Sequence, residues 1–555
     1  MGKGNVARSC AVVLLLWSGI GYGQMIQNIT VGNPKALALG HAVTADPPGL
    51  DSIHFNPAGL AKLRYRGQQT KLLAAHMEIT SRTGSQRNVP SVVAEWEKIN
   101  NAEFPVDDQA NQSATATKPM LTIPFEGMTE VPAIIAPFGG AWFEGFHSSM
   151  TFATSVYTPA AFGFQRDRDN DPGSYQGYQV ALTRLTYLSP SIGIQVSETL
   201  AVGASIGLSW QGFGTKTKFR APEQTLVFLQ GTTQQLNEAI PNEEDRLSIL
   251  GAYDNVGDLT LEMEDNLSPS FNLGILWEPT PWLAFGFVYQ SEAKADMEGE
   301  FIMEYSDEFL GTTTDLQPLS PLLGALFDGA PFNAQPKEQG NVEMELTMPQ
   351  HVSLGTSLKL FPDLKINVDV KWTDYSAWDT FTIKFDQNVD FLNLASVINN
   401  IAHTAGFNVG DNADPDELRL PRKYEAVTSW ALGVEYRWDD NTVLRFGYEP
   451  RGNAVPEDRF DFLVPIGDAT LYSFGIGYQI DAYSRMDVGF GYLYSEFEAD
   501  VNWVEDSEGN ITAVGESKNA NDTTPGQVVY NPYAFLPISG ETSAYLLTLS
   551  YDERF

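Results

Sequence analysis

Segments of about 9–11 residues, in which bulky apolar side chains alternate with small or polar ones, recur along most of this chain. A period of two is that of a β-strand, whose successive side chains point to opposite faces. One segment places Trp430, Leu432, Val434, Tyr436 and Trp438 on one face and Ala431, Gly433, Glu435 and Arg437 on the other. A soluble barrel would turn the bulky apolar face inward. Because the opposite face here carries small and charged residues, we expect lipid outside and a polar lumen inside.

The number and spacing of these segments predict one closed sheet. Their connections alternate between short turns, such as Phe361-Pro362-Asp363, and long loops, as in outer-membrane barrels. We therefore predict an all-β membrane protein with a 14-stranded antiparallel transmembrane β-barrel. Residues 191–196 are assigned to the fifth strand, but they could also belong to the fourth. The expected strands lie at 67–80, 130–139, 146–158, 178–188, 191–196 with 199–213, 268–278, 282–300, 342–360, 364–385, 425–438, 441–449, 470–481, 484–497 and 540–553.

Composition excludes other classes of protein. Beyond the N-terminus, the 555 residues contain no uncharged apolar run near the ~18–20 residues that a spanning helix requires. The net charge of −36 argues against nucleic acid as a partner, because neutralising phosphates requires surplus lysine and arginine. The acidity fits either solvated loops or loops that bridge surface lipids through divalent cations.

The N-terminus reads as a targeting segment. Residues 1–23 are predicted to be a secretory signal peptide, because Lys3 and Arg8 precede an apolar core and a small-residue cleavage site. Its removal would take away Cys10, the single cysteine, and so would exclude thiol or Cys-zinc chemistry.

Residues 24–66 lack the strand period and are predicted to form a hatch, or plug, before a barrel over residues 67–555 with long extracellular loops. Within this segment, Asn56-Pro57-Ala58-Gly59 reads as a turn that cannot continue a helix or a central strand.

With this turn and the terminal Phe555, the chain resembles the FadL-type long-chain fatty-acid transporters of the bacterial outer membrane. Asn56, Pro57 and Ala58 match the family's plug motif, and Met348-Pro349-Gln350 opens a strand as in the family. The resemblance implies a hatch that fills the lumen, a monomer in outer-membrane lipid, no cofactor, and passive uptake of long-chain fatty acids or other hydrophobic molecules. Met25 and Ile26 are expected to line the lumenal binding pocket.

Two apolar stripes at helical spacing are candidates for capturing substrate at the loops. Leu323 and Phe327 belong to one stripe, and Leu394 and Ile398 belong to the other. The alternative is that each stripe packs its loop onto the rim of the barrel.

Lumenal cations are candidates for holding the carboxylate of a fatty acid. Alternation on the ninth strand points Lys371 into the lumen, and Lys384 is expected to point in as well, beyond an interruption near Tyr375. The resemblance places a head-group lysine near Lys384 and another basic position near the end of the fifth strand, which carries Lys216, Lys218 and Arg220. The alternative is that each cation is paired with one of the 70 acidic residues.

The third strand contains Pro159 and Gly163, where we expect strand pairing to break. The resemblance implies that a kink here opens the wall for lateral release into the membrane, whereas the simpler alternative is that the strand ends.

Other functions were weighed against transport. A general diffusion porin would need an open lumen, and a structural or adhesive barrel is a further alternative. We expect no enzyme, because the hydrolase-like run Gly203-Ala204-Ser205-Ile206-Gly207 lies inside an alternating strand. The scattered histidines suggest no metal site.

Overall fold

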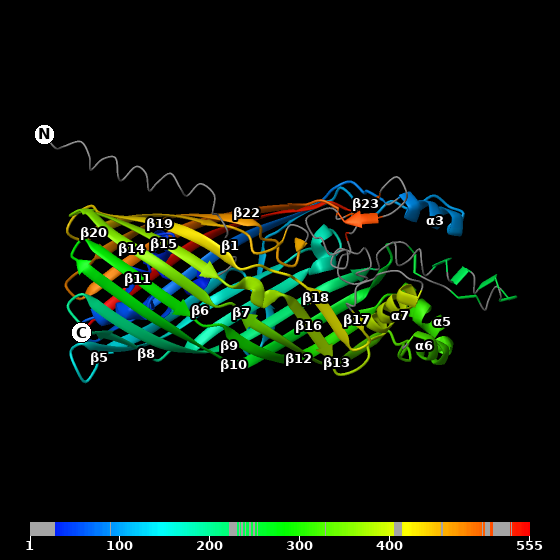
Figure 1. The fold of residues 1–555 in the computed structure, drawn as a ribbon, viewed down its shortest axis with the longest axis horizontal. Helices are drawn as coiled ribbons and strands as arrows, with labels where there is room; N and C mark the ends of the chain where they lie inside the picture. Colours follow the sequence, from blue (N-terminus) through cyan, green and yellow to red (C-terminus); the bar gives the residue numbers. More distant parts are fainter. Residues whose placement is uncertain are drawn as a thin grey trace.

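The computed structural model describes residues 28–220, 250–327, 329–404, 413–501 and 536–555 except 89, 252, 457 and 458, together with Tyr533 and short pieces within 230–247 and 503–513. In these residues the chain forms a closed antiparallel barrel, which is elongated along its axis (Figure 1). The first strand, β1 (Gly67–Thr83), pairs with the last, β25 (Ile538–Arg554), over its whole length, which closes the ring. No helix in the described part is long and apolar enough to cross a membrane.

Fourteen strand positions make up the ring in the described residues, which confirms the predicted fold class. Several positions consist of two strands separated by a short break. In addition to β1 and β25, the ring contains β5 (Ile134–Glu144), β6 (Met150–Gln165), β7 with β8 (Gln179–Leu188, Ser191–Gln195), β9 (Leu200–Arg220), β10 (Asn255–Thr280), β11 with β12 (Leu283–Gln290, Ala293–Tyr305), β13 with β14 (Lys337–Met348, His351–Phe361), β15 with β16 (Leu364–Thr373, Thr380–Phe385), β18 with β19 (Glu417–Pro421, Val427–Arg437), β20 (Thr442–Arg451), β21 (Asp468–Gln479) and β22 (Ser484–Ala499). Because β8 pairs with β6 and β9, the neighbours of β7, residues 191–195 belong to the preceding strand.

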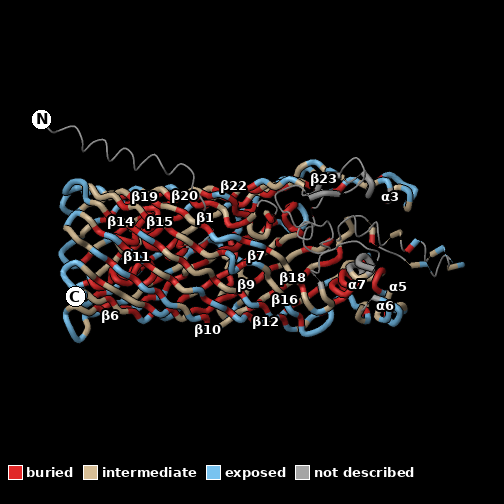
Figure 2. The backbone as a smooth tube through the Cα atoms, viewed as in Figure 1, coloured by how far each residue is buried: buried red, intermediate tan, exposed pale blue. Residues whose placement is uncertain are grey.

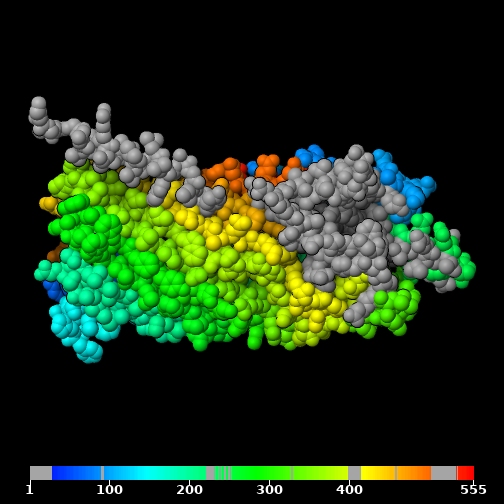
Figure 3. All heavy atoms as spheres, viewed as in Figure 1, coloured from blue at the N-terminus to red at the C-terminus, as the bar shows by residue number. Residues whose placement is uncertain are grey.

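Short turns and the C-terminus lie at one end of the barrel, and the loop helices lie at the other (Figure 1). Exposed residues are frequent in the turns and loops at these two ends, and buried residues alternate with more exposed ones along the strands between them (Figure 2). Strands from the middle of the chain lie side by side across one face (Figure 3). The loop elements are α3 (Pro90–Asn100), β2 (Ser113–Ala116), β3 (Lys118–Ile123), β4 (Gly127–Glu130), η4 (Pro172–Gln176), α5 (Asp307–Leu316), η6 (Gln317–Leu319), α6 (Ser320–Phe327), η7 (Tyr375–Trp378), α7 (Asp390–Thr404), β17 (Ala413–Asp414), β23 (Trp503–Glu505) and β24 (Ile511–Ala513).

The inside and outside faces exchange polarity part-way along several neighbouring strands. On β11, Phe285 and Phe287 are exposed on the outer face, as the alternation predicts for a lipid-facing band. Beyond the break at Ser291, the odd-numbered Met297 is buried and the even-numbered Glu298 is exposed. A shift of one residue exchanges the two faces of a strand.

The same exchange occurs at Pro349 between β13 and β14, and at the irregularity between Asp265 and Ser268 of β10. Across η7, odd-numbered residues face inward on both β15 and β16, but these residues change from polar to apolar. Towards the turns, the interior is polar and the exterior apolar. Towards the loops, the interior is a large apolar cluster that includes Leu261 and Met344, and the outer face is acidic. The part towards the loops therefore has the polarity of a water-surrounded barrel.

The N-terminal segment lies inside the ring on the side of the turns. It comprises η1 (Ile29–Val31), α1 (Pro34–Ala38), η2 (Gly49–Asp51), α2 (Ser52–Phe55) and η3 (Pro57–Lys62). Its elements pack against β6, β9 and β10 and also against β20, β21 and β22, which are distant parts of the ring. Nearly every residue from 28 to 61 is buried. We refer to residues 28–66 as the hatch.

Candidate functional site

The predicted hatch motif fixes the hatch to the barrel wall. The side chain of Asn56 donates from Nδ2 to the carbonyl oxygens of Thr44 (2.7 Å) and Ile275 on β10 (3.1 Å), and its Oδ1 accepts from the backbone N–H of Ala58 (3.2 Å). A Cβ atom at Gly274 would lie 2.1 Å from Oδ1 of Asn56. Glycine on the wall therefore permits close contact with the motif, and the asparagine side chain joins the two parts.

Buried ion pairs hold the hatch at other points. Lys71 on β1 lies 2.6 Å from a carboxylate oxygen of Asp51, and both side chains are almost completely buried. Burial opposes ionisation of Asp46, but Lys35 and Lys365 outweigh it and hold the pKa of this carboxyl well below its usual range. The carboxylates of Asp46 and Asp51 in the hatch are thus compensated within the protein.

Lys371 is also paired within the protein. It faces the lumen as predicted, but its Nζ lies 2.7 Å from Oε1 of Glu449, whose other oxygen is bonded to Arg451 and His41. The alternative of an internal pair therefore describes Lys371.

The predicted inward position of Lys384 is wrong. Ile383 and Phe385 are buried in the apolar cluster, whereas Lys384 is exposed and lies opposite Glu343. The reason is that odd-numbered residues face inward on both β15 and β16, but the interior changes from polar to apolar at η7, so the apolar Ile383 and Phe385 face inward and Lys384 faces outward.

An apolar cavity of about 690 Å³ lies on the side of the loops. Its wall on β9 consists of Phe213, Thr215, Thr217 and Phe219, and β10, β13, β16 and β18 contribute aliphatic and aromatic side chains. The remaining lining residues are Tyr175, Gln176, Leu463 and the ion pair of Arg422 with Asp461. Lys216, Lys218 and Arg220 alternate with the lining residues of β9 and do not line the cavity. Arg220 instead binds both carboxylate oxygens of Asp107 at 2.7 and 2.8 Å, and Lys218 lies 3.7 Å from Asp169. The expectation that the three cations face a lumenal ligand is thus corrected.

Some residues of the two apolar loop stripes fit packing onto the rim of the barrel, and others fit substrate capture. Leu394 is buried and Leu323 packs against the apolar cluster, as expected for stripes that fix the loops to the rim. Leu322 and Leu326 on α6 are instead 55% and 61% exposed. The side chains of Phe327 and Ile398 lie outside the described residues, as do Met25 and Ile26.

The wall of the barrel is interrupted beside the hatch. In the described residues, β6 pairs with β5 only up to Val156, although β5 continues from Gly139 back to Ile134 in its pairing with β1. On the other side of β6, the register with β7 shifts between Tyr157 and Ala160, around Pro159. Proline removes a ladder donor, which accounts for the irregularity.

The strand does not end at this point, because β6 continues to Gln165. Gly163 lies in regular pairing with Ala181, and a Cβ there would lie 2.3 Å from the carbonyl oxygen of Met120. Pro159 therefore marks the interruption, whereas Gly163 permits the close approach of β3.

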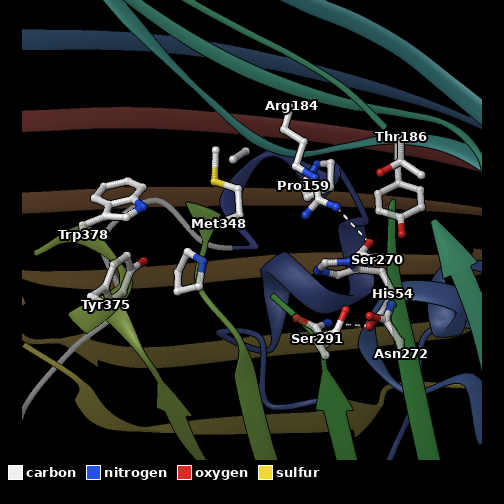
Figure 4. A pocket seen from close by; sticks show the side chains of 14 residues that line it. His54, Pro159, Arg184, Thr186, Ser270, Asn272, Ser291, Met348, Tyr375 and Trp378 are labelled. Atoms are coloured by element: carbon white, nitrogen blue, oxygen red, sulfur yellow. Dashed lines mark hydrogen bonds between the residues drawn. The ribbon is translucent and has the colours of Figure 1, made fainter. Parts of the chain in front are cut away.

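A pocket with an empty volume of about 650 Å³ lies where the hatch, the interrupted strand and the apolar interior meet. In Figure 4, Arg184, Ser270 and His54 lie on one side, and Met348, Tyr375 and Trp378 lie on the other. The lining residues are His54, Tyr157, Pro159, Ala160, Arg184, Thr186, Ser270, Asn272, Gln290, Ser291, Met348, Pro349, Tyr375 and Trp378.

The sequence analysis missed Arg184. It donates from Nη2 to the hydroxyl oxygen of Ser270 (2.8 Å) and is buried on β7. The sequence does contain a signal for this residue, because Arg184 is the only Lys, Arg, Asp or Glu on β7. An ionisable group at membrane depth suggests a function. Among the described residues, no group of three or more His, Cys, Asp and Glu side chains is placed to hold a metal ion.

A family model described as "Outer membrane protein transport protein (OMPP1/FadL/TodX)" matches residues 12–555. The chain belongs to this family. Its members are channels for hydrophobic substrates rather than enzymes, and the predicted location in the bacterial outer membrane is confirmed.

Individual relatives of the OMPP1/FadL/TodX family are distant. The long-chain fatty acid transport protein of Escherichia coli O6:H1 is 23% identical over 256 residues, which cover 45% of this chain and 48% of that protein. The chain therefore matches about half the length of this curated relative.

Solved structures of the family match over nearly the whole chain. A Pseudomonas aeruginosa FadL homologue is 15% identical with a TM-score of 0.64, and the match covers 96% of this chain and all of the other. The Ralstonia pickettii toluene transporter TbuX is 14% identical with a TM-score of 0.54, covering 95% and 99% of the two chains. At these identities the likeness shows the shared fold.

Proposed function

We propose that this protein takes up long-chain fatty acids or other hydrophobic molecules passively across the outer membrane. Substrate is captured at the loops, binds in the barrel, and leaves sideways through the wall at β6 after the hatch rearranges. The observation that carries the proposal is the interruption of β6 pairing around Pro159, which adjoins the pocket beneath the apolar interior.

The exposed side chains of α6 support capture at the loops. Leu322 and Leu326 present apolar surface to solvent, while Leu323 on the same helix packs against the apolar cluster. A hydrophobic molecule that leaves water gains about 25 cal/mol for each Å² of apolar surface that it buries. The helix therefore offers a first contact that continues into the interior.

A continuous aromatic contact supports passage from the upper cavity to the pocket. Trp378 lines the pocket, Phe381 lines the cavity, and their ring centroids are 5.8 Å apart. Side-chain movement at these rings would connect the two spaces without any movement of the barrel.

Direct contacts between the hatch and the interruption support a role for the hatch in release. The hydroxyl of Thr30 donates to the carbonyl oxygen of Thr158 (3.0 Å), and the ring of His54 lies 5.3 Å from that of Tyr157. Displacing the hatch would remove the partner of a carbonyl next to Pro159. A general diffusion porin is not favoured, because the hatch occupies the lumen. The barrel closes within a single chain, through the pairing of β1 with β25, which supports a monomer surrounded by outer-membrane lipid.

Obstruction of the interruption tests this proposal. Ala160→Trp adds bulk where Ala160 lines the pocket, and Thr154→Trp adds the same bulk to an exposed position on the same strand. Uptake of labelled hexadecanoate is measured in cells that lack their own long-chain transporter and is normalised to assembled barrel at the surface. We expect Ala160→Trp to lower uptake by at least about tenfold, the effect of ~1.4 kcal/mol on the barrier, and Thr154→Trp to leave it unchanged. Wild-type uptake by an assembled Ala160→Trp barrel would refute lateral release at this point.

A further inference from the structure

Among the residues that the structure describes, the buried cation Arg184 has no anionic partner. Its side chain is 8% exposed, and its Nη2 donates to Ser270, but its Nε has no hydrogen-bond partner within the described part of the chain. No carboxylate of the described residues lies within 4.0 Å of its guanidinium group. The pocket lining contains no Asp or Glu, although the chain has 70 acidic residues against 34 basic ones.

Several other buried cations of this barrel are paired closely with carboxylates. Lys71, Lys371 and Arg451 each have a carboxylate oxygen within 2.7 Å. Removing a charge from water costs several kcal/mol unless a counter-charge compensates it. Arg166, another buried cation, has a more distant carboxylate, that of Asp171 at 3.8 Å. Among the described residues, Arg184 therefore differs from all four of these cations in having no carboxylate within 4.0 Å and in lining a pocket.

We infer that Arg184 binds the carboxylate of an anionic amphiphile and makes this channel select acids over uncharged molecules of the same length. This inference rests on the proposed function and names the substrate class of the same pocket. A planar guanidinium group can hold a carboxylate through two parallel hydrogen bonds.

The remainder of the pocket fits such an amphiphile. Around Arg184, Ser270, Asn272 and Gln290 make this side of the pocket polar, with the amides of Asn272 and Gln290 fixed by donating to the carbonyl oxygens of Ile53 and His54 in the hatch. Met348 and Trp378 on the opposite side provide apolar surface for the chain and belong to the apolar cluster that continues towards the loops. A carboxylate at Arg184 would thus lie at the end of the apolar interior.

The position of Arg184 also connects binding to release. Arg184 lies directly opposite Ala160 on β6, the first paired residue after the register shift. A carboxylate held here would stop the amphiphile beside the interruption of the wall. An uncharged hydrocarbon would have no such attachment, so the two kinds of substrate would differ in binding strength.

The test compares an acid with the matching alcohol on the full-length protein. Binding of radiolabelled dodecanoate and 1-dodecanol to the protein in lipid nanodiscs is measured at pH 7.5, and binding to empty nanodiscs is subtracted. The variants are Arg184→Met, which removes the charge, Arg184→Lys, which keeps it, and Lys216→Met as a matched control on a cation that does not line either cavity. Assembly is checked by the heat-dependent mobility of the folded barrel.

We expect Arg184→Met to weaken dodecanoate binding by roughly 10- to 100-fold, the effect of losing a charged hydrogen-bond partner, and to change 1-dodecanol binding less than about twofold. Arg184→Lys should retain part of the preference for the acid, and Lys216→Met should behave as wild type. An equal loss for acid and alcohol, or no loss for the acid, would overturn the role of Arg184 while leaving the proposed channel intact. Wild-type protein that binds neither molecule would overturn both proposals.

Discussion

The buried pair between Lys71 and Asp51 is predicted to be a main attachment of the hatch. Lys71 Nζ lies 2.6 Å from Asp51 and also donates to the carbonyl oxygen of Val31 (3.0 Å), and neither side chain of the pair is more than 1% exposed. Lys71→Met would leave Asp51 buried with a hydrogen bond from Asn33 but without its counter-charge. Such a loss costs about 3–5 kcal/mol, which raises the equilibrium constant for local opening roughly 10²- to 10⁴-fold.

Hydrogen–deuterium exchange read by mass spectrometry measures this opening on peptides from residues 28–63 of the assembled barrel. The matched control is Lys62→Met, which removes a lysine of the hatch from a pair with Glu278 in which both side chains are more than one third exposed. Because exposed pairs contribute little, its exchange should remain near wild type. Adding Asp51→Asn to Lys71→Met removes the uncompensated charge and should recover part of the protection. Unchanged exchange in Lys71→Met, or a double variant that opens further, would refute this reasoning.

Two other predictions concern the hatch and the loops. Burial lowers the pKa of His54 from its ordinary 6.5 to about 3, so an opened hatch binds a proton below pH 6.5 that the closed hatch does not. The contribution of His54 should therefore weaken closure as pH falls from 6.5 towards 3, by about 2 kcal/mol between pH 7 and pH 5. Exchange of the hatch should show a smaller pH dependence in His54→Gln than in wild type, because the buried His41 of the hatch, whose pKa burial also lowers, remains. At the loops, Leu322→Asp with Leu326→Asp should reduce hexadecanoate uptake several-fold without reducing barrel assembly, since both side chains are exposed. Uptake equal to wild type would assign capture to another surface.

The barrel could be predicted because its pattern is local. In the lipid-facing band, each strand shows its outer face through side chains such as Phe474 and Tyr551, and no distant contact is needed to read it. The interruption at Pro159 was also visible, because proline acts on its own strand.

The candidate cations were harder to place because their roles depend on distant partners. Lys371 faces the lumen as alternation predicts, but its pairing with Glu449 joins strands β15 and β20, which alternation cannot relate. The prediction for Lys384 failed because it placed the apolar Ile383 and Phe385 on the lipid side, whereas the barrel interior at β16 is apolar and takes up both side chains. Arg184 is marked in the sequence as the only Lys, Arg, Asp or Glu of its strand, but the absence of a carboxylate around it within the described residues can be seen only in the structure.

The exchange of polarity gives a physical reason for release through the wall. On the eighth strand it occurs at Pro349, next to Met348, and both residues line the pocket that also contains Pro159 and Ala160. A hydrophobic molecule that moves along the apolar interior therefore reaches the interruption of the wall at the level where that interior ends. Movement onward through the lumen would place it among the buried ion pairs of the hatch, at a cost of about 25 cal/mol for each Å² of apolar surface that loses its apolar surroundings. Movement sideways leads from one apolar environment to another. On the proposed mechanism, this difference directs the substrate into the membrane without any source of energy.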